Sequence, residues 1–379
     1  MFPIVETTGS AFERGRQHGE RASERVGRSI ATYARLFAYC GMDWREAQQH
    51  ALPYRDVIGS FDATLLEEIE GIAAGADRKT EEVLALNSRT EILPPSYPGD
   101  PAPQWKAVAE RNRGAGIPDW GECTALAVPR GTSATGGTLL AQNWDWLGQQ
   151  REALILLRTT ENDGTGVLTL TEAGMLAKIG LNSHGFGVCL NILRSRDDGS
   201  RPGVPVHVLL RALLRRRSVA DAIEFAGKLS FGASSNVHCA DVSGDCAGLE
   251  CSPRGLYVVR GQGTTLCHTN HYLCVEPQAF ENVLAASLST LPRLARAGAL
   301  VSGRTRLSLA YLQRVLRDES DGYLSICRQP DPALVPELRI ESVAGVIMEL
   351  DRRVMHVAPG VPSATGFSAI ALEREPALV

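Results

Sequence analysis

Hydrophobic residues recur at helical spacing through the first third of the chain. The period of 3.6 residues predicts a helix over residues 21–40, with arginines and glutamates opposite an apolar face. That face carries Val26, Ile30, Tyr33, Ala34 and Phe37. The same spacing predicts helices over residues 61–76 and 80–87, the second with Thr80 as N-cap candidate and glutamates in its first turn. The first third is therefore expected to be largely helical.

After residue 122 the pattern changes to short apolar segments separated by turns. Residues 124–128 and 138–142 predict a hairpin, because the turn between them, centred near residue 133, is rich in Pro, Gly, Ser and Thr. Helices are expected over residues 204–215, 219–228 and 290–316. Further strands are expected at residues 154–159, 167–171, 179–181, 187–192, 237–242, 248–251, 256–259, 265–269, 343–350, 354–358 and 367–372. Antiparallel sheets packed together with helices outside fit this pattern best.

A proline-rich connection, residues 93–120, joins the helical part to the β-rich part. Connections of this length without regular structure are usually functional or disordered. It is followed by Gly121 and Glu122, directly before Cys123. The sequence thus divides into residues 1–122 and residues 123–379.

Composition narrows the function classes. The 379 residues are 44% hydrophobic and 22% charged, which is typical of a globular protein, and the net charge of −4 argues against a dedicated nucleic-acid binder. The sequence contains no apolar run of about 18 residues, so no membrane span is predicted. It begins without a basic cluster followed by an apolar stretch, so no signal peptide is predicted. We therefore expect a cytoplasmic protein whose nine cysteines remain thiols.

Familiar motifs for metals and cofactors are absent, so we expect none. One group of residues contains the side-chain types that bind metals, but not at a standard spacing. These cysteines are better explained as buried thiols on strands than as metal ligands. The group is Cys239, Cys246, Cys251, Cys267, His268 and His271.

Cys123 stands out because it begins a predicted strand. A turn centred on residue 133 would place Cys123 opposite Asn143, with Asp145 two residues further along on the same face. No histidine is near in sequence to act as a base. Cleavage before Cys123 would free an α-amine that titrates near pH 8 and is attached to the nucleophile. A plain buried cysteine beside a turn aspartate is the alternative, and spacing alone favours it.

A series of motifs in the same order resembles the penicillin acyltransferase-like, autoproteolytic C45 family of N-terminal nucleophile (Ntn) hydrolases. The motifs are Gly15–Gly19, Glu70–Ala76, Leu86–Glu91, Cys123–Thr124, Gln142–Asp145, Thr171–Gly174, Gly180–Ser183, Asn191, Arg201–Pro205, Glu250–Pro253, His268–His271 and Ser325–Arg328. The resemblance implies an α+β fold, a four-layer αββα sandwich preceded by a largely helical segment. It also implies self-cleavage between Glu122 and Cys123, giving an α chain, 1–122, and a β chain, 123–379, held together as a heterodimer.

The resemblance further implies site residues. Cys123 would be the nucleophile in processing and turnover, Asp145 would lie beside the new amino terminus, and Asn270 would donate a hydrogen bond to the oxyanion. Arg339 matches an active-site arginine. The remaining candidates are Asn191 and Ile192, near which a backbone N–H would assist the oxyanion, and Trp144 and Trp146, which would line the pocket.

The expected function is cleavage or transfer of an acyl group through an acyl-Cys123 intermediate. The substrate would be a small acyl-amide or acyl thioester, and pocket access for water would decide between hydrolysis and transfer. An unprocessed small-molecule-binding protein without turnover is the alternative. Glu122 supports that alternative, because the fungal member of the family has glycine there. Leu338 is a second departure: that enzyme has serine beside the arginine, so a polar contact would be lost and the substrate would differ.

Overall fold

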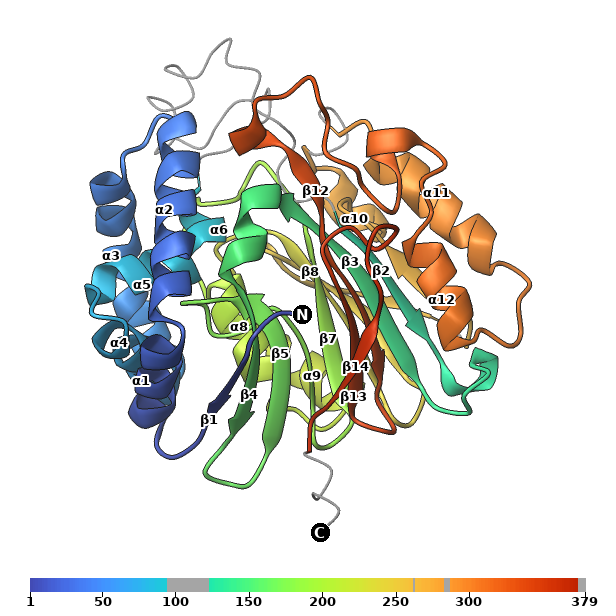
Figure 1. Ribbon diagram of the computed structural model, residues 1–379, viewed down its shortest axis with the longest axis horizontal. Helices are drawn as coiled ribbons and strands as arrows, with labels where there is room; N and C mark the ends of the chain where they lie inside the picture. The colour runs from blue at the N-terminus through green and yellow to red at the C-terminus, as the bar shows by residue number, and fades with distance from the viewer. Residues whose placement is uncertain (94–122, 262, 283–286, 374–379) are drawn as a thin grey trace.

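Two β-sheets face each other at the centre of the computed structural model, and helices cover their outer faces (Figure 1). The structure describes residues 1–93, 123–261, 263–282 and 287–373. In order across the eight-stranded sheet lie β1 (Ile4–Thr7), β4 (Leu154–Thr160), β5 (Gly166–Glu172), β6 (Ile179–Asn182), β7 (Phe186–Ile192), β8 (Ser235–Asp241), β9 (Cys246–Ser252) and β10 (Gly255–Arg260). Across the six-stranded sheet lie β11 (Leu266–His268), β2 (Cys123–Val128), β3 (Leu139–Leu147), β12 (Ile340–Glu349), β13 (Val354–Pro359) and β14 (Ser368–Ala371).

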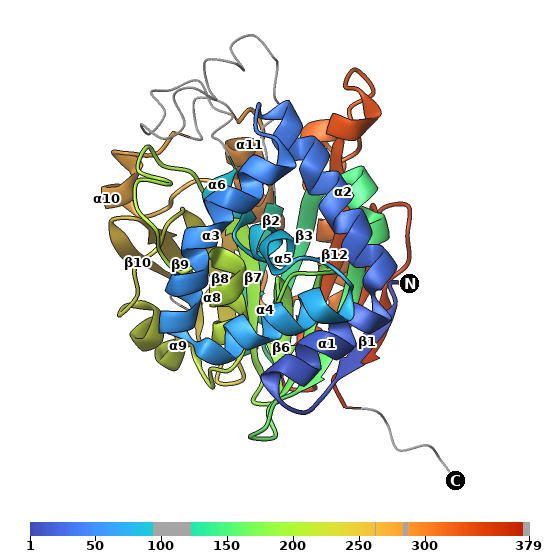
Figure 2. The same cartoon turned by 90° about the vertical axis from the view of Figure 1, so that its left-hand side faces the viewer.

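The helices form two outer layers (Figures 1 and 2). The layer beside the eight-stranded sheet contains α1 (Ala11–Arg21), α2 (Ser23–Tyr39), α3 (Trp44–Phe61), α4 (Ala63–Gly75), α5 (Thr80–Asn87), α6 (Arg89–Ile92), α8 (Val206–Leu213) and α9 (Val219–Ala226). The layer on the six-stranded sheet contains α11 (Thr290–Val301) and α12 (Leu309–Leu316), and a short helix, α10 (Val275–Gln278), precedes it in the chain. The expected α+β, four-layer αββα fold with a helical N-terminal segment is confirmed.

Three helices of the N-terminal third lie where their periodicity predicts them, whereas α1 was not predicted. The helix expected over 80–87 is α5, and those expected over 21–40 and 61–76 are α2 and α4 with slightly later starts. α4 begins at Ala63 because the Asp62 side chain accepts a hydrogen bond from the Thr64 N–H. α3 was not predicted, since its sequence is polar and contains Pro53. A capping box between Asp43 and Glu46 nevertheless starts it.

Glycines let α1 and α4 pack in close contact, side by side in Figure 2. A Cβ atom at Gly15 would lie 2.0 Å from the Glu68 carbonyl oxygen, and one at Gly71 would lie 2.2 Å from the Phe12 carbonyl oxygen. Gly19 and Gly75 make equivalent contacts with the facing backbone. The glycines of the two N-terminal motifs are therefore explained by helix packing.

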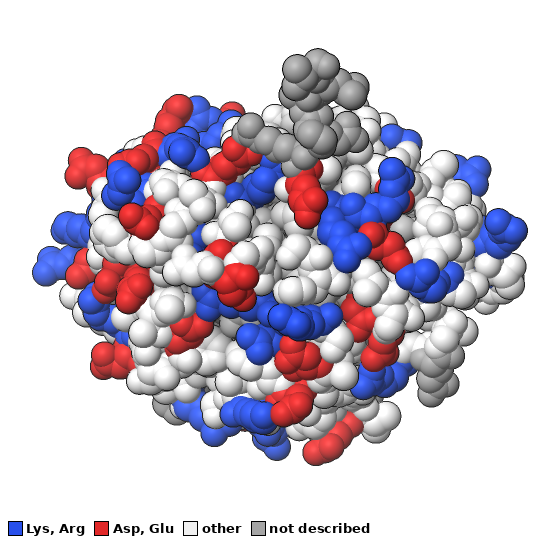
Figure 3. Space-filling model, turned by 90° about the horizontal axis from the view of Figure 1, so that it is seen from below, with Lys and Arg blue, Asp and Glu red and all other residues white. Residues whose placement is uncertain are grey.

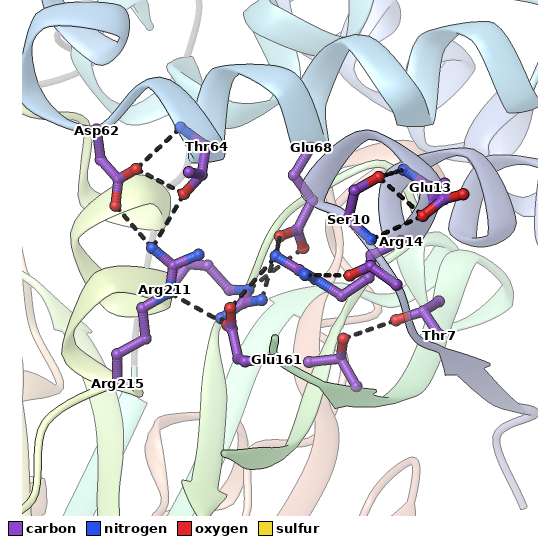
Figure 4. Close-up of polar contacts among 12 residues, drawn as sticks. Thr7, Ser10, Glu13, Arg14, Asp62, Thr64, Glu68, Glu161, Arg211 and Arg215 are labelled. Carbon is purple, nitrogen blue, oxygen red and sulfur yellow. Dashed lines mark hydrogen bonds and ion pairs between the residues drawn. The ribbon is translucent and has the colours of Figure 1, made fainter. Parts of the chain in front are cut away.

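A buried cluster of charged residues connects the N-terminal helices to the rest of the chain (Figure 4). Arg14 of α1 lies 3.4 Å from Glu68 of α4 and 3.2 Å from Glu161 in the β4–β5 turn. Arg211 of α8 pairs with both carboxylates, and Arg215 lies 3.1 Å from Glu161. Residues on both sides of the 122–123 boundary thus share one network of ion pairs.

The outer surface mixes both signs of charge. Figure 3 shows acidic and basic side chains interspersed over one face. Among the described residues, no helix combines the length and apolar character that crossing a bilayer requires. Within the same ranges, no group of three or more His, Cys, Asp or Glu side chains is placed to hold a metal ion.

Candidate active site

Cys123 is the first residue of β2, in the interior of the six-stranded sheet. It is 4% exposed and belongs to the apolar core between the two sheets. Glu122, the other half of the predicted processing site, lies outside the described residues. The geometry of the site is therefore built from Cys123 onward.

The observed strand register corrects one expectation. Cys123 pairs with Trp144, not with Asn143, so Trp144 shares its face of the sheet. Asp145 alternates to the other face together with Asn143, whose side chain donates to carbonyls of the outer layer, at Leu316 and Ile326. The prediction that Asp145 shares the face of Cys123 is wrong, because a shift of one residue moves every side chain to the opposite face.

Side chains from three distant parts of the chain hold the backbone of Cys123. Its N–H donates to Asn270 Oδ1 at 2.7 Å. Its carbonyl oxygen accepts from Asn191 Nδ2 at 3.1 Å and from Arg293 Nη1 at 2.7 Å. Asn270 follows β11, Asn191 lies in β7 and Arg293 lies in α11. The strand start is thus fixed by tertiary contacts with both sheets and an outer helix.

Asn270 has a defined orientation. Its Oδ1 accepts from the Cys123 N–H and from Arg293 Nη2 at 3.0 Å, so the amide nitrogen occupies the other side. Nδ2 donates to the Ile192 carbonyl oxygen at 2.9 Å. Because a side-chain amide carries two N–H donors, the second can serve another acceptor. Ile192 meets Asn270 through its carbonyl, and the predicted backbone donor near Asn191 or Ile192 stays a prediction.

Asp145 keeps one carboxylate oxygen without a partner. Oδ1 accepts a 2.6 Å hydrogen bond from the Ser342 hydroxyl, whereas Oδ2 is buried and has no hydrogen-bond partner among the described residues. Burial raises the pKa of Asp145 to about 7, with Arg293 and Ser342 acting in the opposite direction. This carboxyl group is ready to accept a hydrogen bond from a nearby cation.

The surroundings of Cys123 keep its thiol protonated. Burial raises its pKa to about 11, and the Asp145 carboxylate adds to this effect. A hydrogen bond from the Asp145 backbone N–H and the charges of Lys178 and Arg293 act in the other direction. Nucleophilic chemistry at this sulfur therefore needs a proton acceptor.

Sequence reasoning missed Arg293. The guanidinium contacts the Cys123 carbonyl and Asn270 Oδ1, and it also donates to Thr124 Oγ1 at 3.0 Å. The only available signal was an arginine inside a predicted helix, and a helix pattern does not show which arginine is buried. Arg339, the predicted active-site arginine, instead donates to carbonyls of its own loop, at Leu334 and Pro332.

Trp144 and Trp146 are both buried and face cations. Lys178 Nζ lies 3.8 Å from the Trp144 ring centroid, and the Arg89 guanidinium lies 4.7 Å from that of Trp146. Glu172 accepts from Lys178 at 3.2 Å and from the Tyr33 hydroxyl. The tryptophans therefore belong to a buried polar cluster on the Cys123 face, and their contact with substrate stays a prediction.

The two histidines beside Asn270 fasten its segment. His268 Nε2 lies 2.9 Å from Glu250 Oε1, and Glu250 also accepts from the Leu273 N–H at 2.6 Å. His271 Nδ1 lies 2.9 Å from the Thr290 hydroxyl, which accepts from the Asn270 N–H. Both histidines therefore hold the Asn270 segment in place through hydrogen bonds to neighbouring elements.

A surface cavity of about 540 Å³ lies beside β1, the edge strand of the eight-stranded sheet, and its neighbour β4. Its lining includes Glu6, Gln17, Arg21 and Arg158 and none of the predicted site residues. The position of Cys123, not this cavity, therefore defines the candidate site.

Comparison with known proteins agrees with the motifs. The family model for acyl-coenzyme A:6-aminopenicillanic acid acyltransferase matches residues 132–333, more than half of the chain. The "acyl-coenzyme A:6-aminopenicillanic-acid-acyltransferase 40 kDa form" of Emericella nidulans is 30% identical over 329 residues, which cover 86% of this chain and 84% of that protein.

Among solved structures, a mutant of conjugated bile acid hydrolase from Clostridium perfringens superposes with a TM-score of 0.46 and 12% identity, covering 66% of this chain and 92% of that chain. Penicillin V acylase from Agrobacterium tumefaciens gives a TM-score of 0.30 and 13% identity, covering 64% of this chain and 77% of that chain. On the strength of the family model and the Emericella relative, the chain belongs to the acyl-coenzyme A:6-aminopenicillanic acid acyltransferase family.

Proposed function

We propose that the chain cuts itself between Glu122 and Cys123 and then cleaves or transfers acyl groups through an acyl-Cys123 intermediate. The α and β chains remain together as a heterodimer. The substrate is a small acyl-amide or acyl thioester. The name of the Emericella relative indicates a thioester donor and an amine acceptor, whereas water as acceptor would make the enzyme an amidohydrolase.

The observation that carries this proposal is the set of contacts around the Cys123 backbone. Asn270, Asn191 and Arg293 bind its N–H and carbonyl although they come from distant parts of the chain. β11 pairs with β2 only from Ala125 to Ala127, so these side chains, and not a strand, hold the backbone of Cys123 on that side. An N-terminal nucleophile needs such support, because a free chain end would otherwise fray.

Self-cleavage follows from ordinary acyl chemistry. The sulfur of Cys123 attacks the carbonyl carbon of the preceding residue, the C–N bond breaks, and the nitrogen gains a proton to become an α-amine. Water then hydrolyses the resulting thioester, which releases a carboxylate at Glu122 and restores the thiol. The new ammonium group would find an open acceptor in Oδ2 of Asp145.

Turnover uses the same sulfur with a new base. The α-amine of Cys123 takes the thiol proton, the sulfur attacks the acyl carbonyl of the substrate, and the leaving amine or thiol departs with a proton. Water or an acceptor amine then removes the acyl group from the sulfur. The second N–H of Asn270 donates to the negatively charged oxygen that forms in both acylation and deacylation. One such donor typically lowers the activation free energy by about 3 kcal/mol.

Intact-mass spectrometry of the purified protein tests the proposal. Two fragments that meet at Glu122–Cys123, together with an uncut chain in Cys123→Ala, are expected. A wild-type chain that stays whole would instead favour a small-molecule-binding protein without turnover. Cys123→Ser is expected to slow or block cleavage and to abolish turnover.

The acyl step is tested by offering the processed protein a panel of acyl-amides and acyl thioesters. Release of the acid identifies hydrolysis, and a new amide identifies transfer. Asn270→Ala is expected to lower turnover by roughly 10²-fold or more, the usual effect of losing an oxyanion donor. A near-normal rate in that variant would show that Asn270 does not bind the oxyanion.

A further inference from the structure

Self-cleavage poses a problem that turnover does not. Before the bond breaks, the nitrogen of Cys123 is an amide and has no basic lone pair, so the α-amine cannot take the thiol proton. Arg293 keeps its proton at all ordinary pH values. Besides Arg293, two charged side chains lie close enough to change the pKa of the Cys123 thiol, and both are candidates for the proton acceptor: Asp145 and Lys178.

The two candidates lie on different sides of β3. Asp145 alternates to the outer face, where Ser342 binds it. Lys178 lies above the inner face: its Nζ is 3.8 Å from the ring centroid of Trp144, the residue directly opposite Cys123. The Cβ atoms of directly opposed residues are about 5 Å apart. The lysine amine is therefore placed on the side of the sheet to which the thiol points.

Lys178 is held in this position by its neighbours. Its backbone N–H donates to Thr169 Oγ1 at 3.2 Å, and its Nζ donates to Glu172 Oε2 at 3.2 Å. The side chain is 4% exposed. A lysine fixed in this way is not a solvated surface charge, and the cleavage and turnover steps described above do not involve it.

We infer that Lys178 accepts the thiol proton of Cys123 in the self-cleavage step, an inference that rests on the proposed function. The neutral amine takes the proton as the sulfur attacks the preceding carbonyl carbon. The resulting ammonium then returns that proton to the nitrogen of Cys123 as the C–N bond breaks. Lysine thus ends the step as it began, and the α-amine that it has helped to create serves as base in turnover.

The electrostatic setting allows a neutral lysine. Burial lowers the pKa of Lys178 to about 7; Glu172 acts in the opposite direction, and Arg89 acts in the same direction as burial. A substantial fraction of the amine is therefore unprotonated near neutral pH. The titratable and charged groups around it come from α2, α6, β2, β5 and α8: Tyr33, Arg89, Cys123, Glu172 and His207.

Lys178→Arg is the direct test, because arginine keeps the charge that faces Glu172 but does not give up its proton. Freshly synthesised full-length chain is followed by intact mass at neutral pH, and circular dichroism reports folding. Cleavage is expected to slow by about 10²- to 10⁴-fold, the usual range for loss of a general base. The matched control Lys228→Arg changes an exposed lysine and should cleave like wild type. A folded K178R chain that cleaves within about threefold of wild type overturns the inference.

A second measurement keeps the inference testable where K178R does not fold. The wild-type cleavage rate should rise with pH and level off once Lys178 has lost its proton. Glu172→Gln removes the carboxylate that raises the pKa of Lys178, so the midpoint should move to lower pH. A rate that rises without a plateau up to about pH 10, or a midpoint that E172Q leaves in place, overturns the inference. A wild-type chain that never cleaves removes the proposed function as well, whereas an unaffected K178R removes only the role of Lys178.

Discussion

Glu161→Gln should lower the free energy of unfolding by about 3 kcal/mol. The side chain of Glu161 is 9% exposed and pairs with Arg14, Arg211 and Arg215 (Figure 4). Burial alone would raise the pKa of Glu161, but Arg211, and then Arg215 and Arg14, outweigh burial and lower it from 4.5 to about 2. At about 1.4 kcal/mol for each pH unit, that difference corresponds to about 3 kcal/mol. Loss of one partner from a buried ion pair gives a similar figure of about 3 to 5 kcal/mol.

The pH dependence has a definite sign. Because the folded-state pKa of Glu161 is depressed, its stabilisation is complete above the unfolded value of 4.5 and is lost as pH falls toward about 2. The difference between wild type and E161Q should therefore be largest near neutral pH and should shrink below pH 4.5.

Urea unfolding followed by tryptophan fluorescence measures this difference, with every protein compared carrying Cys123→Ala so that the chain stays whole and refolds as one molecule. The matched control is Glu224→Gln, which removes a carboxylate from an exposed pair with Lys228 and should change stability by less than about 0.5 kcal/mol. A loss in E161Q no larger than that of the control would refute the reasoning, as would a difference that stays constant down to the lowest pH at which the protein folds.

Three further changes have defined outcomes. Gly71→Ala forces α1 and α4 apart, because the new Cβ would lie 2.2 Å from a backbone oxygen of α1; we expect a loss of about 2 kcal/mol in thermal unfolding, while Gly298→Ala, with nothing within 4 Å, should be neutral or stabilising. Arg293→Met frees the Oδ1 side of Asn270 and should slow turnover roughly 10²-fold, and unchanged kinetics would show that Asn270 needs no such support. Burial raises the pKa of Glu91 to about 8, so the contribution of Glu91 to stability is highest below pH 4.5 and falls as pH rises to about 8. Glu91→Gln removes this loss, so its melting temperature should exceed that of wild type by more at pH 8 than at pH 5. Equal differences at the two pH values would contradict this.

Local patterns in the sequence predicted much of the architecture. The helix over residues 80–87 and the hairpin after Cys123 follow from periodicity and turn chemistry, which act over a few residues. The hairpin register was one residue off, because a turn composition locates its centre only to within about one residue. That small error is large in its consequence, since it places Asp145 on the opposite side of the strand.

The support around Cys123 could not be read from the sequence. Arg293 and Asn270 lie 170 and 147 residues from Cys123 in the chain, and they meet it only when both sheets and α11 have assembled. Lys178 is a further example, since its role depends on its distance from the Trp144 ring. Motif resemblance supplied Cys123 and Asn270, but an arginine and a lysine outside those motifs gave no local signal.

β1 ties the start of the chain into a sheet that otherwise consists of residues after Cys123. It pairs in parallel with β4, from Ile4 opposite Leu156 to Thr7 opposite Thr159. A break before Cys123 would leave this strand in place but change its molecularity, because the pairing would then join two separate polypeptides. The cut protein would keep its shape, yet its refolding would depend on concentration and on diffusional encounter of the pieces. Such a protein would have to fold before it is cut. Once cut and unfolded in dilute solution, its two pieces would rarely meet, so it would not refold.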